Sequence, residues 1–233
     1  MRRLVVLAAL VLAMLPTGIS EAGTTPKCFG KNVTILGTDG FDHLTGTEGT
    51  DVMHGLAGDD GLIAWLGITR PDRRDFICGG DGDDRMSPGV GSDFVDGGRG
   101  ADQGDGFRGN DTLLGGSGPD QLNGAEGSDT VDGGPGNDLI LNSIARQNDP
   151  NSDVYLGGDG NDWVRAGGSS SGFFGEDFIS GGEGDDVLEG TAELHQAERP
   201  GFPDIIDGGP GWDICYADPD DTVIDCEDVR PPE

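Results

Sequence analysis

The chain has 233 residues, with 44 acidic and 14 basic side chains and a net charge of −30 at pH 7. Nucleic acid and anionic membrane surfaces would repel so acidic a protein, which argues against both as partners. Only 33 % of the residues are hydrophobic and 45 are glycine. This composition argues against an ordinary layered core and is compatible with a narrow core inside a repetitive fold.

Residues 1–22 have the pattern of a secretory signal peptide. Arg2 and Arg3 form a basic start, an apolar run extends over Leu4–Leu15, and small residues precede the expected cleavage after Ala22. The run is too short for a membrane-spanning helix, which needs about 20 residues. We therefore expect a secreted, extracellular protein without a membrane span. An uncleaved N-terminal anchor is the alternative.

The rest of the chain divides into a repetitive middle and two short ends. We expect residues 23–36 to form an N-terminal cap and residues 218–233 a C-terminal cap, with a closing strand at Thr222–Ile224. Repetitive folds need caps because their ends otherwise expose apolar side chains and unpaired backbone groups. The repeats themselves occupy residues 37–217.

Within this middle part, residues 79–141 are seven consecutive nine-residue units. Each unit is rich in glycine over its first four positions and has aspartate at its sixth. Its eighth position is apolar in every unit except the one that contains Gly104. A fixed short period of this kind is typical of a fold built from stacked structural repeats.

The unit itself suggests how the chain coils. Its glycines allow tight turns with positive φ, and the three residues from its seventh position on suit a short strand. Such a strand is unstable alone and must pair with copies of itself. Turn, strand, turn and strand then close one coil in every two units, or eighteen residues. This places Asp84, Asp102 and Asp120 in one column of turns, and Asp93 and Asp111 in another.

A column of carboxylates indicates a bound cation. Paired strands lie about 4.8 Å apart, so stacked carboxylates at that spacing repel one another unless a positive charge lies between them. The available ligands are carboxylate and carbonyl oxygens, which suit Ca²⁺ with its six to eight oxygen ligands. Mg²⁺ fits less well because it prefers a strict octahedron and retains water.

The units resemble the RTX (repeats-in-toxin) family, whose repeat is G-G-x-G-x-D-x-U-x, where U is apolar. The resemblance covers about three quarters of the chain and implies an all-β, right-handed parallel β-roll (β-helix) solenoid. It also implies Ca²⁺ ions held between turns of adjacent coils by aspartate carboxylates and turn carbonyls. The candidate ligands are Asp42, Asp51, Asp60, Asp84, Asp93, Asp102, Asp111, Asp120, Asp129, Asp138, Asp162, Asp177, Asp186 and Asp213.

Three aspartates in register are weaker candidates. Asp75, Asp153 and Asp204 lack the preceding glycines. A flexible Gly/Asp-rich linker is the alternative interpretation of the whole region. We disfavour it because disorder does not require an apolar residue at a fixed offset from each aspartate.

The nine-residue spacing is interrupted four times. It slips by six residues at three places, and Asp186 is followed eighteen residues later by Asp204. We interpret the latter gap as a loop, although a degenerate repeat with His195 at the aspartate position also fits the spacing. Loops in repeat proteins are often where partners bind, so a cell-surface or polysaccharide partner would be sought there. The four insert loops are expected near residues 64–74, 142–152, 166–174 and 190–203.

Four cysteines in a secreted chain suggest two disulfides, for which three pairings exist. We favour Cys215–Cys226, which would fasten the C-terminal cap, and Cys28–Cys78, which would tie the opening segment to an early coil. A zinc site or a reactive thiol is the alternative, but neither a Cys-x-x-Cys spacing nor a neighbouring histidine supports it.

The repeats contain no convincing catalytic motif. Residues 168–172 match the Gly-x-Ser-x-Gly of a nucleophile elbow, but they lie in a Ser/Gly loop rather than a strand–turn–helix. The sequence therefore predicts a secreted calcium-binding protein, not an enzyme, that folds on binding extracellular Ca²⁺ and has a structural or adhesive role. A hydrolase or lyase acting on polysaccharide, built on a parallel β-helix, is the alternative.

Overall fold

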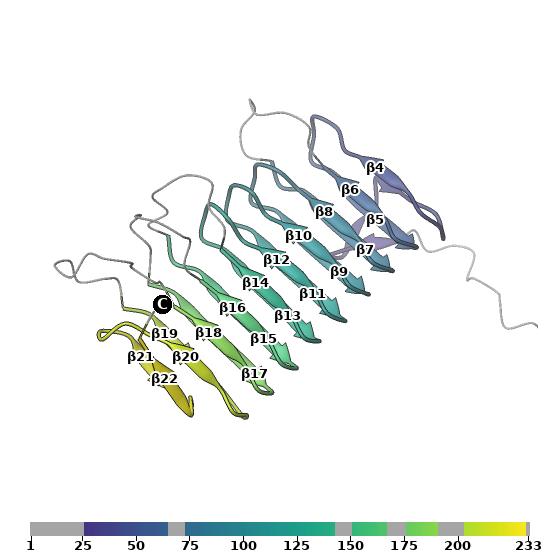
Figure 1. Ribbon diagram of the computed structural model, residues 1–233. Coiled ribbons are helices and arrows are strands. Elements are labelled where there is room, and N and C mark those ends of the chain that lie inside the picture. The colour runs from purple at the N-terminus through teal and green to yellow at the C-terminus, as the bar shows by residue number, and fades with distance from the viewer. Residues whose placement is uncertain (1–25, 65–72, 143–150, 167–175, 191–202, 232–233) are drawn as a thin grey trace, which may run out of the picture.

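A computed structural model of the protein describes residues 26–64, 73–142, 151–166, 176–190 and 203–231 (Figure 1). Their regular structure consists of strands alone: two parallel sheets of ten strands each and one small antiparallel hairpin. The expected all-β parallel β-roll is confirmed. Figure 1 shows the coils stacked in sequence order from the purple N-terminal end to the yellow C-terminal end. Over the described residues, no helix has the length and hydrophobicity of a membrane span.

The two sheets take alternate strands of the chain. We call the one with mostly six-residue strands the long-strand sheet and the one with three-residue strands the short-strand sheet. The long-strand sheet contains β3 (Ile35–Leu36), β5 (Val52–Ala57), β7 (Phe76–Asp81), β9 (Phe94–Arg99), β11 (Thr112–Ser117), β13 (Thr130–Pro135), β15 (Val154–Asp159), β17 (Phe178–Glu183), β19 (Ile205–Asp207) and β21 (Thr222–Ile224). The short-strand sheet contains β4 (His43–Thr45), β6 (Gly61–Ile63), β8 (Arg85–Ser87), β10 (Gln103–Asp105), β12 (Gln121–Asn123), β14 (Leu139–Leu141), β16 (Trp163–Arg165), β18 (Val187–Glu189), β20 (Ile214–Tyr216) and β22 (Asp228–Arg230).

The strand register shows how the period becomes a coil. Leu113 in β11 lies opposite Val131 in β13, so one coil takes two nine-residue units. Where the spacing slips, the register absorbs the extra residues. Val131 pairs with Tyr155, and Ile179 in β17 pairs with Ile206 in β19. Most of each of the four expected insert loops lies outside the described residues, which leave out 65–72, 143–150, 167–175 and 191–202.

The core is a single file of apolar side chains between the two sheets. Each coil contributes two residues, the middle one of its short strand and the second one of its long strand. Both stand at the eighth position of a nine-residue unit. Gly104 is the one gap in this file between Met86 and Leu122, and the side chains of Leu113 and Leu122 lie beside it. The fully or nearly fully buried members are Met53, Leu62, Ala64, Ile77, Met86, Val95, Leu113, Leu122, Val131, Ile140, Tyr155, Val164, Ala166, Ile179, Leu188, Ile206 and Cys215.

A disulfide-linked hairpin covers the outside of the roll near its N-terminal end. Strands β1 (Lys27–Cys28) and β2 (Lys31–Asn32) pair antiparallel, and Cys28 is bonded to Cys78 of β7. The ring of Phe76 stacks on Phe94 of β9, with centroids 5.1 Å apart, and the hairpin loop lays Phe29 against both. The hairpin therefore shields an aromatic pair that would otherwise face solvent.

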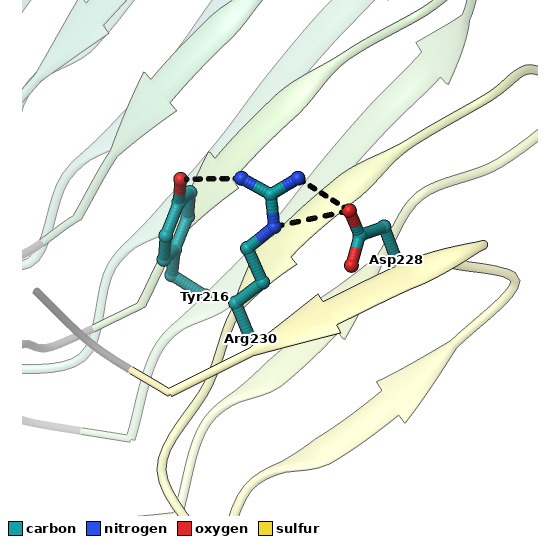
Figure 2. Close-up of polar contacts among 3 residues, drawn as sticks. All are labelled: Tyr216, Asp228 and Arg230. Carbon is teal, nitrogen blue, oxygen red and sulfur yellow. Dashed lines mark hydrogen bonds and ion pairs between the residues drawn. The ribbon is translucent and has the colours of Figure 1, made fainter.

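The C-terminal end is closed by β21 and β22, which continue the two sheets, and by the second expected disulfide, Cys215–Cys226. Figure 2 shows how β22 is fixed to β20: the guanidinium of Arg230 donates to the hydroxyl of Tyr216 at 3.2 Å and binds the carboxylate of Asp228. Both predicted disulfide pairings are thus present in the structure.

Candidate metal sites in the turns

Glycine is required in the turns for two reasons. Gly98 and Gly116 have φ of 107° and 106°, a left-handed conformation that other residues adopt only with strain. In addition, the carbonyl oxygen of Gly98 points at the Cα of Gly116 in the next coil. A Cβ on Gly116 would approach that oxygen more closely than the 3.0 Å limit of real Cβ contacts. The turns of successive coils are therefore packed backbone on backbone, with the carbonyl oxygen of one glycine close to the glycine of the next turn.

The aspartates form two ladders of hydrogen bonds. In each, the backbone N–H of one aspartate donates to Oδ1 of the aspartate one coil further on, at distances such as 2.8 Å for Asp102 and Asp120. The first column consists of Asp42, Asp60, Asp84, Asp102, Asp120, Asp138, Asp162, Asp186 and Asp213. The second column consists of Asp51, Asp75, Asp93, Asp111, Asp129, Asp153, Asp177 and Asp204.

In the first column the second carboxylate oxygen has no hydrogen-bond partner. This holds for Oδ2 of every first-column aspartate after Asp42, whose Oδ2 accepts from Thr38. All of these oxygens are buried, and a buried carboxylate oxygen without a partner costs about 1–3 kcal/mol or more. A column of such atoms indicates that a ligand outside the polypeptide belongs beside them. The atoms are Oδ2 of Asp60, Asp84, Asp102, Asp120, Asp138, Asp162, Asp186 and Asp213.

A carbonyl oxygen converges on the same place as each of these carboxylates. A Cβ built on Gly115 would lie closer than 3.0 Å both to Oδ2 of Asp120 and to the carbonyl oxygen of Gly133, one coil on. Only glycine leaves that space free. The same pair of oxygens, one carboxylate and one carbonyl, lies beside the equivalent glycine of each first-column turn: Gly37, Gly55, Gly79, Gly97, Gly115, Gly133, Gly157, Gly181 and Gly208.

This donor set fits calcium. Carboxylate and carbonyl oxygens are the hard ligands that Ca²⁺ takes in flexible geometry. Within the described parts of the chain, no three side chains of His, Cys, Asp or Glu cluster as a metal site. A cation in the turns would therefore bind carboxylates together with backbone carbonyls, which is what the glycine positions expose.

Burial makes these carboxylates hard to ionise. Desolvation, together with the negative charges of neighbouring aspartates, raises the pKa of Asp84 and Asp102 to about 7, although the backbone N–H bonds act against the shift. The pKa of Asp111 in the second column rises to about 8 for the same reasons. Burial also raises the pKa of Asp120, Asp162 and Asp186 to about 6. A bound cation would offset the repulsion and favour the ionised forms.

The structure brings all fourteen predicted aspartates into the two ladders; their role as metal ligands stays a prediction. It also places Asp75, Asp153 and Asp204 there, in spite of their missing glycines. Sequence reasoning missed the residues that end the ladders: the N–H of Asp204 donates to Asp221, and the N–H of Asp213 donates to Glu227.

Glu227 and Asp221 carry no periodic signal in the sequence. Asp221 follows Asp204 by 17 residues and Glu227 follows Asp213 by 14, so neither falls on the nine-residue spacing. The only sequence clue was the acidic character of the stretch around them. Both side chains act as the last acceptor of a column, in place of an aspartate in a further coil.

Comparison with protein families gives one match. The family model described as RTX calcium-binding nonapeptide repeat (4 copies) matches residues 34–67, 72–103, 105–140, 149–170, 171–192 and 201–224, well over half of the chain. No curated protein matches the chain. The matched segments contain all of the aspartates in both ladders.

Proposed function

Because the chain belongs to the RTX calcium-binding nonapeptide repeat family, we propose that it is a secreted protein that folds when extracellular Ca²⁺ fills its turns. Its role is structural or adhesive, without catalysis. The observation that carries this proposal is the column of buried Oδ2 atoms, each beside a glycine and a converging carbonyl oxygen.

Calcium binding and folding are linked in such an arrangement. The carboxylate of Asp120 and the carbonyl of Gly133 come together only when two coils are stacked, so the unfolded chain has no preformed site. Binding free energy then becomes folding free energy. Without the cation, the net charge of −30 and the low hydrophobic content favour an expanded chain.

Two further observations support a secreted protein. The N-terminal signal-like segment lies outside the described residues and stays a sequence prediction. The disulfides Cys28–Cys78 and Cys215–Cys226 are of the kind that persists in oxidising compartments. Extracellular calcium modules bind at about 10⁻⁴–10⁻³ M, so the chain would stay unfolded at cytosolic calcium concentrations and fold after export.

The adhesive role has an observation of its own. An open depression of about 1000 Å³ lies over the outer face of the short-strand sheet, from Phe41 to β14. The side chains of Arg85, Gln103 and Gln121 stand in one row along its floor, one coil apart, and Phe41 is largely exposed at its end. Planar polar groups beside an exposed ring suit a neutral polysaccharide. The test is retention of the calcium-loaded protein on insoluble polysaccharide, lost in Gln103→Ala/Gln121→Ala.

Circular dichroism of residues 23–233 during titration with CaCl₂ tests the main proposal. The expected result is a coil-to-β transition that EGTA reverses and that Mg²⁺ alone does not reproduce. A chain that is already rich in β-structure in EGTA would show that the roll forms without metal, and would remove calcium-driven folding from the account.

A further inference from the structure

The two columns of turns differ in the residue that stands beside each carboxylate. In the first column that residue is glycine in all nine turns, from Gly37 to Gly208. In the second column it is the residue that follows each strand of the short-strand sheet. Reading along the roll, these residues are Gly46, Ala64, Pro88, Gly106, Gly124, Asn142, Ala166, Gly190 and Ala217.

The interruptions of the register fall in the same column. The extra residues lie in turns of the second column, directly before Asp75, Asp153, Asp177 and Asp204. The ladder bonds that these aspartates accept therefore span 24 or 27 residues instead of 18. The first-column separations lengthen only because they span the same extra residues. The first column thus keeps an uninterrupted turn at every coil.

Asp153 is where the second column departs furthest from the first. Its Oδ2 accepts one hydrogen bond from Nδ2 of Asn142 and one from the hydroxyl of Tyr155, each at 2.9 Å. All three side chains are buried. Asn142 stands where Gly124 stands one coil earlier, and Tyr155 is the one core residue of its row with a hydroxyl group.

These two donors use the oxygen that the first column leaves without a partner. In the same coil, nine residues further on, Oδ2 of Asp162 has no hydrogen-bond partner and lies beside Gly157 and the carbonyl of Gly181. The two aspartates are matched at Oδ1, because each accepts the N–H of the preceding aspartate in its ladder at 2.8 Å. They differ in what surrounds Oδ2.

We propose that Ca²⁺ binds along the first column from Asp60 on and that the second column is closed to the ion at Asp153, where Asn142 and Tyr155 supply the contacts that the cation supplies elsewhere. This inference rests on the proposed function. Two buried donors satisfy the carboxylate without an ion, and the Asn142 side chain fills the space that glycine leaves open. One edge of the roll is then a continuous calcium column, and the other is divided at Asp153.

The test compares Asp153→Asn with Asp162→Asn, two substitutions of the same kind in one coil. The measurement is the number of Ca²⁺ ions bound per folded chain, by flow dialysis with ⁴⁵Ca²⁺ and native mass spectrometry, with circular dichroism to confirm folding. Asp162→Asn is expected to lose at least one ion, and Asp153→Asn to bind as many as the wild type. Equal losses in both variants, or no loss in either, would overturn the asymmetry.

A second variant covers the case in which Asp153→Asn does not fold. Asn142→Gly combined with Tyr155→Phe removes both donors from Asp153 and restores the glycine. It is expected to bind one ion more than the wild type, and a count equal to or below the wild-type count contradicts the inference. If the wild-type protein binds no Ca²⁺ at all, the proposed function itself fails, which is a separate outcome.

Discussion

The backbone N–H of Asp120 donates to Oδ1 of Asp138, one coil further along the roll, at 2.8 Å, while Oδ2 of Asp138 is buried without a hydrogen-bond partner. Each carboxylate thus divides its two oxygens between two tasks. One oxygen joins adjacent coils through the backbone, and the other remains for a ligand.

Gly115→Ala should weaken calcium-driven folding. The added methyl group would collide with the backbone carbonyl oxygen of Gly133 and with Oδ2 of Asp120. The carboxylate of Asp120 is held in place because its Oδ1 accepts the N–H of Asp102. Overpacking of this kind costs about 1–3 kcal/mol, and here it also displaces ligand oxygens. We expect the free energy of unfolding in saturating calcium, measured with urea, to fall by about this amount, and the calcium midpoint, followed by circular dichroism, to rise.

Gly40→Ala is the matched control for that substitution. No atom lies within 4 Å of a Cβ built on Gly40, and its φ is not in the left-handed region. Its midpoint should stay within about twofold of the wild-type value, in line with the small effects of surface substitutions. Equal shifts for Gly115→Ala and Gly40→Ala would show that the space beside Gly115 has no special role.

Gly104→Ala should stabilise the roll. The new Cβ would enter the core file in ordinary contact with Leu113 and Val95, at 3.6 and 3.9 Å, and would press only on Cδ2 of Leu122 at 3.1 Å. A side-chain methyl group can shift by a few tenths of an ångström. Gly-to-Ala changes at compatible positions contribute about 0.4–1 kcal/mol. Urea unfolding in saturating calcium measures the effect, and a lower free energy of unfolding would contradict the packing described here.

Acid should favour the metal-free roll and oppose calcium binding. The pKa of Asp84, Asp102 and Asp111 in the folded state is raised to about 7, 7 and 8, above the ordinary value of 3.8. A raised folded-state pKa stabilises the fold below the unfolded-state pKa, and that stabilisation is lost as the pH rises through the folded-state value. Metal-free protein should therefore contain more β-structure at pH 5 than at pH 8.

The calcium midpoint should move the other way, because protons compete with the ion for the same carboxylates. Titrations by circular dichroism at pH 5.5 and pH 7.5 check both halves of this prediction. A midpoint that is lower at pH 5.5 would mean that the buried carboxylates are not the calcium ligands.

The disulfide between Cys28 and Cys78 should contribute more stability than the one between Cys215 and Cys226. The first joins residues 50 apart and the second residues 11 apart. By the chain-entropy model this difference in loop length amounts to about 1 kcal/mol. Paired serine variants of each bridge, unfolded with urea in saturating calcium, give the comparison. A larger loss for the Cys215–Cys226 bridge would show that closing the C-terminal end matters more than loop length.

The sequence was most informative where the period is regular. The spacing from Asp84 to Asp138 indicates the eighteen-residue coil, in which Leu113 pairs with Val131, and a slip of one residue would turn an apolar side chain such as Leu113 out of the core. The two disulfides also followed from the sequence, since one fastens each end of the roll. The division of the aspartates into two ladders depends only on this alternation.

Features that depend on contacts across an interruption could not be predicted. Asn142 precedes the six extra residues of this interruption, and Asp153 and Tyr155 follow them. The three side chains meet because the strand register is the same before and after the interruption. The covering of Phe76 and Phe94 by the β1–β2 hairpin likewise depends on a turn at Phe29 and Gly30, which no periodicity signals. Single residues outside the repeat are fixed by tertiary contacts, which a repeat pattern does not encode.

Crystals of residues 23–233 grown in CaCl₂ offer the most direct test of the central claim, through the anomalous scattering of calcium. The account predicts ions along the first column, each in contact with Oδ2 of an aspartate such as Asp120 and with a turn carbonyl such as that of Gly133. A folded roll in millimolar calcium, with no ion beside these oxygens, would contradict it.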